Sequence, residues 1–112
     1  MQLYERLSFY TLAFEQYNEW QTENKQVFAK LKKLIKETAK TPFEGTGKPE
    51  ALKYEYAGYW SRRITDEHRL VYKVEEAYIR IVSCKFIINN KQFIYYFFRQ
   101  RLQAIPWQFK YQ

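Results

Sequence analysis

The spacing of apolar residues along the first part of the chain predicts one strand followed by two helices. Residues 7–10 form a short apolar and aromatic run that is typical of a strand. Apolar residues then recur every three or four positions, first in a helix that we expect Thr11 to cap and then over residues 24–40. Pro42 ends the second helix, because proline offers no N–H and restricts the residue before it.

Alternation of apolar and polar residues replaces the helical spacing further along the chain. Residues 59–64, 68–74 and 78–86 form three such runs, and they are separated by turns at residues 65–67 and 75–77. The order is one strand, two helices and three antiparallel strands. This order predicts an α+β domain in which the N-terminal strand and two helices pack on an antiparallel sheet.

The first two alternating runs predict a hairpin with a specific register. Trp60 and Ile64 share one face of the first run, and Arg63 lies on the other. If Ile64 pairs opposite His68, Arg63 lies directly opposite Arg69. Two arginines in this arrangement repel each other unless an anion lies between them. The pattern therefore favours an anion site on that face of the hairpin.

Composition narrows the class of protein. The 112 residues have room for one domain. The single cysteine, Cys84, excludes an intrachain disulfide and favours a reducing cytoplasm. Residues 1–10 lack the pattern of a signal peptide, and no apolar run approaches the roughly 18 residues of a membrane span. We expect a cytoplasmic protein without membrane contact.

The basic charge favours an anionic partner. The net charge is +7 and the pI is about 9.5. Residues 87–112 hold four Lys or Arg and no acidic residue, so much of the excess lies in this tail. The outer side of the second helix is lysine-rich, which indicates either a solvated face or contacts to a phosphate backbone. Its lysines are Lys25, Lys32, Lys33, Lys36 and Lys40.

The candidate chemistry is concentrated in residues 45–69. We expect one acid, Glu50, to lie among five cations of this segment, a combination that suits a phosphodiester. The cations are Lys48, Lys53, Arg62, Arg63 and Arg69. One Cys and one His do not make a structural zinc site, and the glycines of residues 45–47 lack the context of a nucleotide-binding loop. We therefore expect no metal and no cofactor.

Two stretches of the chain resemble a known family. Residues 41–53, TPFEGTGKPEALK, and residues 58–72, GYWSRRITDEHRLVY, look very much like the YoeB/Txe toxins of the RelE superfamily. The similarity covers about residues 7–86. It implies a RelE-like fold and the toxin of a bacterial type II toxin–antitoxin system, a ribosome-dependent endoribonuclease (mRNA interferase). The implied partners are mRNA in the ribosomal A site, ribosomal RNA and a YefM/Axe-type antitoxin. The resemblance leaves open whether the chain also forms a homodimer.

The resemblance also implies roles for single residues. Cleaving RNA without a metal needs a base for the ribose 2′-OH, a cation for the charged phosphorane and an acid for the leaving 5′-oxygen. Glu50 matches the base of the family, and Arg69 matches the clamp on the transition-state phosphate oxygens. Further phosphate contacts would come from Lys48, Lys53, Arg62 and Arg63.

The C-terminal end departs from the family pattern. The family closes with an aromatic residue, a catalytic histidine and a tyrosine, whereas here Phe86 is followed by Ile-Ile-Asn-Asn. We therefore expect a toxin domain over residues 1–86 and an atypical aromatic and basic extension over residues 87–112. The general acid is then missing, or it is replaced by Lys85 or a tyrosine of the tail.

Two functions stay open as a result. The first is an endoribonuclease that is impaired because the C-terminal catalytic histidine is missing. The alternative is a catalytically inactive toxin remnant that only binds the ribosome, RNA or an antitoxin. We expect His68, the single histidine of the chain, to pack or to form a hydrogen bond rather than to act as the acid.

The extension holds eight of the 23 aromatic residues. Asn89 and Asn90 would turn the chain into an added hairpin, with residues 91–98 as the returning strand. The abrupt loss of the family motif favours a shifted reading frame or an altered gene end. The alternative is that the interleaved basic and aromatic residues bind single-stranded RNA by stacking.

Overall fold

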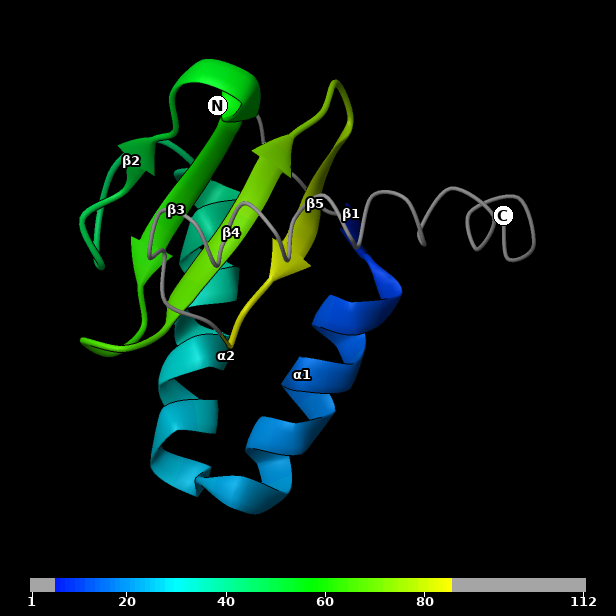
Figure 1. The fold of residues 1–112 in the computed structure, drawn as a ribbon, viewed down its shortest axis with the longest axis vertical. Coiled ribbons are helices and arrows are strands. Elements are labelled where there is room, and N and C mark those ends of the chain that lie inside the picture. The colour runs from blue at the N-terminus through cyan, green and yellow to red at the C-terminus, as the bar shows by residue number, and fades with distance from the viewer. Residues whose placement is uncertain (1–5, 86–112) are drawn as a thin grey trace.

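Within residues 6–85, which the computed structural model describes, five strands form one mixed sheet and two α-helices pack on it (Figure 1). In chain order the elements are β1 (Arg6–Phe9), α1 (Thr11–Glu23), α2 (Lys25–Lys40), β2 (Glu50–Ala51), η1 (Tyr54–Tyr56), β3 (Tyr59–Arg63), β4 (Arg69–Val74) and β5 (Tyr78–Ser83). The predicted α+β fold with a first strand and two helices is confirmed.

The strand order β1-β5-β4-β3-β2 adds two features to the prediction. β1 pairs with β5 in parallel, whereas the other neighbouring strands are antiparallel, so the sheet is mixed. β2, a strand of two residues, extends the sheet beyond β3. A strand this short shows no alternation, which is why the pattern of the sequence does not predict it.

The helix ends follow local hydrogen bonding. Thr11 is the first residue of α1 rather than its cap, because Tyr10 holds the extended cap position and forms no capping bond through its side chain. Asn24 does cap α2. Its side-chain oxygen accepts hydrogen bonds from the backbone N–H groups of Gln26 and Val27, both at 3.1 Å. α2 ends at Lys40, two residues before the proline, as expected.

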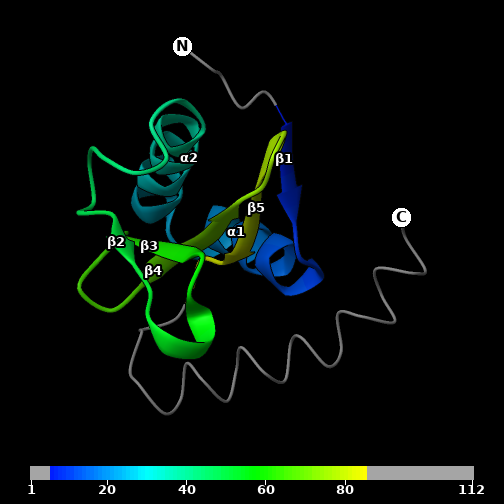
Figure 2. The same ribbon diagram turned by 90° about the horizontal axis from the view of Figure 1, so that it is seen from above.

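Most of the core lies between the sheet and the helices. Leu31, Leu34 and Ile35 of α2 are buried there, and burying each such side chain stabilises the fold by about 1.5–3 kcal/mol. A smaller cluster covers part of the other sheet face and consists of Tyr56, Tyr59, Val71 and Val82. Figure 2 shows α2 and η1 on opposite sides of β3.

The end of β5 is tied to α1 by buried hydrogen bonds. The indole N–H of Trp20 donates to the carbonyl oxygen of Cys84 at 2.9 Å. The backbone N–H of Cys84 donates to the side-chain oxygen of Gln16 at 2.8 Å. Burial raises the pKa of the Cys84 thiol to about 12, so the thiol stays protonated at neutral pH.

Candidate active site

The loop between α2 and β2 carries the first candidate residues, and two glycines give it its path. Gly45 and Gly47 have φ angles of +116° and +86°, in the left-handed region that favours glycine. A Cβ on Gly47 would lie 3.0 Å from the carbonyl oxygen of Arg63. The carbonyl oxygen of Gly47 accepts a hydrogen bond from the backbone N–H of Arg63 at 2.7 Å. The loop is therefore attached to the end of β3.

Glu50 begins β2 on the sheet face that points away from the helices. It pairs in register with Ser61 of β3. Because Trp60, the neighbour of Ser61, packs into the core on the helix side, Ser61 and Glu50 face the other way. Glu50 is exposed, and among residues 6–85 no ion pair within 4.0 Å involves it.

Arg63 and Arg69 pair in register across the β3–β4 hairpin, and this prediction is confirmed. The side chain of Arg63 is 46% exposed and lies 3.9 Å from the carboxylate of Asp66. Arg69 uses Nη1 to donate to carbonyl oxygens of its own turn, at 2.6 Å to Thr65 and 3.1 Å to His68. These bonds orient the guanidinium through one nitrogen, and within residues 6–85 its other donors form no hydrogen bond, which suits them to bind an anion.

The carboxylate and the two guanidinium groups share one side of the sheet. Residues two apart in a strand lie on the same face, so Arg63 lies on the same face as Ser61. Glu50 pairs with Ser61, and Arg69 pairs with Arg63. Glu50 and Arg69 therefore lie on this face as well. Lys48 is exposed just before β2, and Lys53 is exposed just before η1. The structure therefore brings Glu50, Arg63 and Arg69 to one face, and among residues 6–85 no ion pair within 4.0 Å joins Glu50 to a cation.

Arg62 does not belong to this face. Alternation places it with Trp60 on the helix side of β3, where it is 0% exposed. Its guanidinium donates to the backbone carbonyl oxygens of Thr41, Glu44 and Thr46. The prediction that Arg62 contacts a phosphate is therefore wrong, because its donors are already bound inside the protein.

Two residues near the end of β5, His68 and Lys85, are candidates to replace the histidine that the resemblance places after Phe86. His68 is hydrogen-bonded through Nδ1 to the carbonyl oxygen of Lys85, and its ring packs edge-on against Trp20, which confirms the expected packing role. Lys85 Nζ lies 2.6 Å from Glu19 and 2.8 Å from Glu23. Burial disfavours the charged form of Lys85, but these hydrogen bonds outweigh it and raise the pKa. Lys85 is therefore a poor replacement for the acid.

Such a face can accept a proton at Glu50 and stabilise a developing negative charge with the two arginines. In the part of the chain that the structure describes, no three His, Cys, Asp or Glu side chains are grouped to bind a metal ion. In the same part, no helix is long and apolar enough to cross a membrane. The expected absence of a cofactor stays a prediction.

Comparison with known proteins connects this geometry to a family. The family model of the YoeB-like toxin of bacterial type II toxin–antitoxin systems matches residues 9–88. Toxin YoeB of Escherichia coli K12 is 49% identical over 74 residues, which are 66% of this chain and 88% of the relative. The chain belongs to the YoeB-like toxins. It is thus the toxin component of a type II toxin–antitoxin system, as the resemblance implied.

Solved structures of YoeB toxins confirm the RelE-like fold. The YoeB dimer from Staphylococcus aureus has a TM-score of 0.68 and 44% identity, over 72% of this chain and 94% of that chain. The YoeB–YefM complex from the same species has a TM-score of 0.68 and 44% identity, over 77% and 98%. The predicted boundary after residue 86 stays a prediction, because residues 87–112 and the hairpin predicted for them lie outside the described residues.

Sequence reasoning missed the polar residues that surround Arg62. They are Glu37, Thr46 and Tyr72, which contact its guanidinium from α2, the loop and β4. A signal was present in the alternation, because Arg62 occupies a core-facing position between Trp60 and Ile64. The surface role was predicted from its positive charge, since charged side chains are rarely buried, although the alternation indicates a buried position.

Proposed function

We propose that this YoeB-like toxin is a metal-independent endoribonuclease that cleaves mRNA in the ribosomal A site by attack of a ribose 2′-OH. The observation that carries the proposal is the shared sheet face on which Glu50 lies with the register pair Arg63 and Arg69. A carboxylate free of ion pairs among the described residues is suited to accept a proton. Two guanidinium groups side by side are suited to bind a phosphate.

Each residue has a separate role in the proposed reaction. Glu50 takes the proton of the 2′-OH, and Arg69 donates hydrogen bonds to the phosphorane oxygens. Arg69 is prepared for this role, because bonds from Nη1 to its own turn hold the guanidinium in place before substrate arrives. Arg63, Lys48 and Lys53 bind neighbouring phosphates. The net charge of +7 favours approach to the ribosomal RNA.

Protonation of the leaving 5′-oxygen is the step of the proposed reaction that we expect to be slow. The sequence has no histidine after Phe86, and both His68 and Lys85 form other contacts in the described part of the chain. Losing a general acid costs about 10²–10⁴-fold in rate. We therefore propose impaired cleavage, since electrostatic stabilisation by the arginines does not depend on the acid.

The proposed partners follow from the family. YoeB of S. aureus forms a complex with YefM, and we propose a YefM/Axe-type antitoxin for this chain. Because YoeB of S. aureus is also described as a dimer, a homodimer is a second proposed assembly. The proposed site of action is the cytoplasm, where ribosomes translate mRNA.

The engaged state of His68 and Lys85 also favours a second candidate function. With neither group free to donate a proton, the chain would be an inactive toxin remnant that binds the ribosome, RNA or antitoxin without cutting. Both candidates use the same basic face, so binding alone does not separate them.

Cleavage of mRNA on programmed ribosomes separates them. The comparison uses the chain as it stands, a version that ends Phe86-His-Tyr, and Glu50→Ala in each. We expect the restored version to cut, the unaltered chain to cut about 10²–10⁴-fold more slowly, and both Glu50→Ala variants to lose cleavage. Equal cutting with and without Glu50 would overturn the proposed function. Cutting by the restored version alone would favour the inactive remnant.

A further inference from the structure

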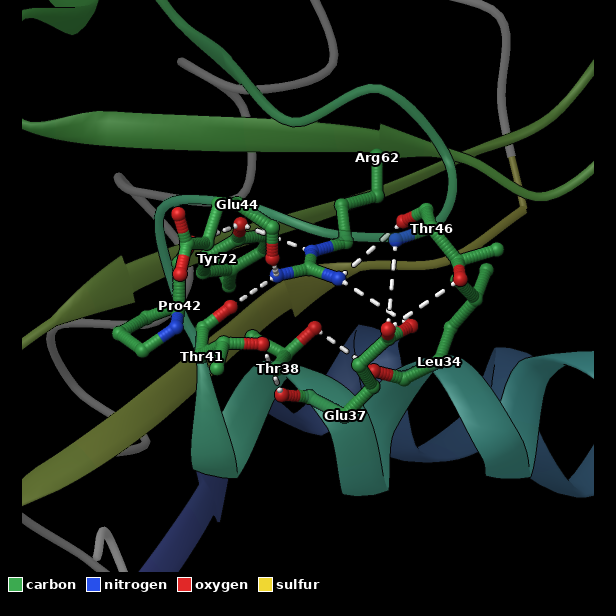
Figure 3. Close-up of polar contacts among 9 residues, drawn as sticks. All are labelled: Leu34, Glu37, Thr38, Thr41, Pro42, Glu44, Thr46, Arg62 and Tyr72. Carbon is green, nitrogen blue, oxygen red and sulfur yellow. Dashed lines mark hydrogen bonds and ion pairs between the residues drawn. The ribbon is translucent and has the colours of Figure 1, made fainter.

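Arg62 is a fully buried arginine whose guanidinium is directed at one short loop (Figure 3). Nε donates to the hydroxyl of Tyr72 at 3.2 Å. Nη1 donates to the carbonyl oxygen of Thr46 at 3.1 Å, and Nη2 donates to the carbonyl oxygens of Glu44, at 2.8 Å, and Thr41. All three guanidinium nitrogens are thus bound, and three of the four acceptors are backbone carbonyls of residues 41–46.

Two further side chains attach the same loop to the domain. The hydroxyl of Tyr72 donates to the carbonyl oxygen of Pro42 at 2.5 Å. Glu37 Oε1 accepts hydrogen bonds from the backbone N–H and the hydroxyl of Thr46, at 3.3 and 3.2 Å, and Oε2 lies 3.6 Å from Arg62 Nη1. We call Arg62, Tyr72 and Glu37 the Arg62 clamp.

The location explains why a buried cation is stable here. Taking a charge out of water is costly unless its donors are satisfied and a counter-charge is near, and Glu37 with the loop carbonyls provides both. Thr41 caps the C-terminus of α2, where unpaired carbonyls and the helix dipole favour a cation. A planar guanidinium can donate in several directions at once, which the compact ammonium of lysine cannot do in the same geometry.

The clamped loop leads directly into the candidate active site. Gly47 ends it, and the next residue, Lys48, has a φ of +51°, a conformation that surrounding contacts must hold. We propose that the Arg62 clamp is a positioning device that holds residues 41–47 in one path and thereby places Lys48 and Glu50 on the face of Arg69. The catalytic part of this proposal rests on the proposed function, whereas the holding of the loop does not.

A role in general stability would give a different result from positioning. If Arg62, Tyr72 and Glu37 only stabilised the fold, weakening them would loosen every element through global unfolding. Positioning predicts a local effect confined to the loop and β2, because the clamp bonds end on residues 41–46.

The test is amide hydrogen exchange by NMR on the full chain, comparing Tyr72→Phe with the unaltered protein. This substitution keeps the buried ring and removes the hydroxyl that links Arg62 to Pro42. We expect the amides of residues 43–50 to exchange about tenfold faster, while amides of α1 and β5 change less than about twofold. Tyr17→Phe in α1 is the matched control, since it removes the same group from a ring that packs between Phe9 and Phe28.

Arg62→Lys gives a second comparison, because it keeps the charge and loses the planar fork. We expect loop exchange at least as fast as in Tyr72→Phe, since an ammonium cannot reach all the acceptors that Arg62 binds. In the version that ends Phe86-His-Tyr, we expect Tyr72→Phe to lower kcat for mRNA cleavage about tenfold, with KM unchanged.

Three results would overturn the inference. The first is loop exchange in Tyr72→Phe equal to that of the unaltered chain, and the second is equal acceleration in every element. The third, a loosened loop with kcat unchanged, would overturn the catalytic part, in which the clamp places Lys48 and Glu50 for the reaction. If the restored version shows no cleavage that depends on Glu50, the proposed function fails instead, and the exchange rates alone decide whether the clamp holds the loop.

Discussion

Arg62 and Arg63 are neighbours in the chain with opposite environments. Arg62 is fully buried on the helix side of β3, where carbonyl oxygens and Glu37 satisfy it. Arg63 is 46% exposed on the other side, where it faces Arg69 in register and lies 3.9 Å from the exposed carboxylate of Asp66, a surface contact that contributes little stability. The two-residue period of a strand alone separates them.

The difference teaches that charge does not reveal the role of an arginine in a strand. The interior arginine organises backbone that would otherwise lack hydrogen-bond donors. The surface arginine faces another cation and gains stability from a bound anion. Substitutions at the two positions should therefore affect different measurable quantities.

The largest expected effect is on the stability of Arg62→Met. Methionine fills part of the volume but leaves the partly buried loop carbonyls and the buried hydroxyl of Tyr72 without their donor. We expect the free energy of unfolding in urea to fall by about 3–5 kcal/mol. Arg63→Met is the matched control and should change it by less than about 0.5 kcal/mol. Equal losses at both positions would remove the distinction between them.

Arg69→Ala should act on the reaction instead. The guanidinium is the proposed stabiliser of the phosphorane, so we expect cleavage by the version ending Phe86-His-Tyr to fall about 10²–10³-fold. Its bonds go to backbone carbonyls of a partly exposed turn that water can also reach, so we expect the free energy of unfolding to change by about 1 kcal/mol. A fold-wide loss of stability that accounts for the lost cleavage would contradict this role.

The smallest expected effect is that of Arg63→Ala on RNA binding. One phosphate contact fewer should reduce the slope of log K against log salt by about 0.7 for a single strand. Binding of a short RNA, measured by fluorescence anisotropy at several salt concentrations, gives this slope. Tyr17→Phe, which leaves the charge unchanged, should keep it. A slope unaltered by Arg63→Ala would exclude a direct phosphate contact.

The elements that the sequence predicted are those with long or regular patterns. Both helices, the first strand and the β3–β4 hairpin follow from apolar spacing, and the pairing of Arg63 with Arg69 follows from a turn of fixed length. The parallel pairing of β1 with β5 has no local signal, because it joins segments from opposite ends of the domain.

The candidate site could also be predicted only in part, because some of its contacts have no local signal in the sequence. The family motif predicts Glu50 and Arg69 as site residues, and their place on one face depends on the pairing of β2, which is too short to be predicted. The predicted phosphate contact of Arg62 was wrong because it followed from the charge of the side chain and not from its position in the alternation. Glu37 and Tyr72 were missed because their contacts to the loop depend on tertiary packing, which pattern alone does not reveal.

The parallel pairing of β1 with β5 also has a consequence for how the chain folds. β1 pairs with β5 through residues such as Leu7 and Ile79. The adjoining bond from Cys84 Sγ, just after β5, to the carbonyl oxygen of Ala13 in α1 spans 71 positions. Closing such a long loop is entropically costly, so we expect it to come late, whereas the β3–β4 hairpin joins residues a few positions apart. During synthesis the sheet cannot be completed until β5 has left the ribosome. On the nascent chain, Arg63 and Arg69 can therefore pair before the sheet that also holds Glu50 is complete.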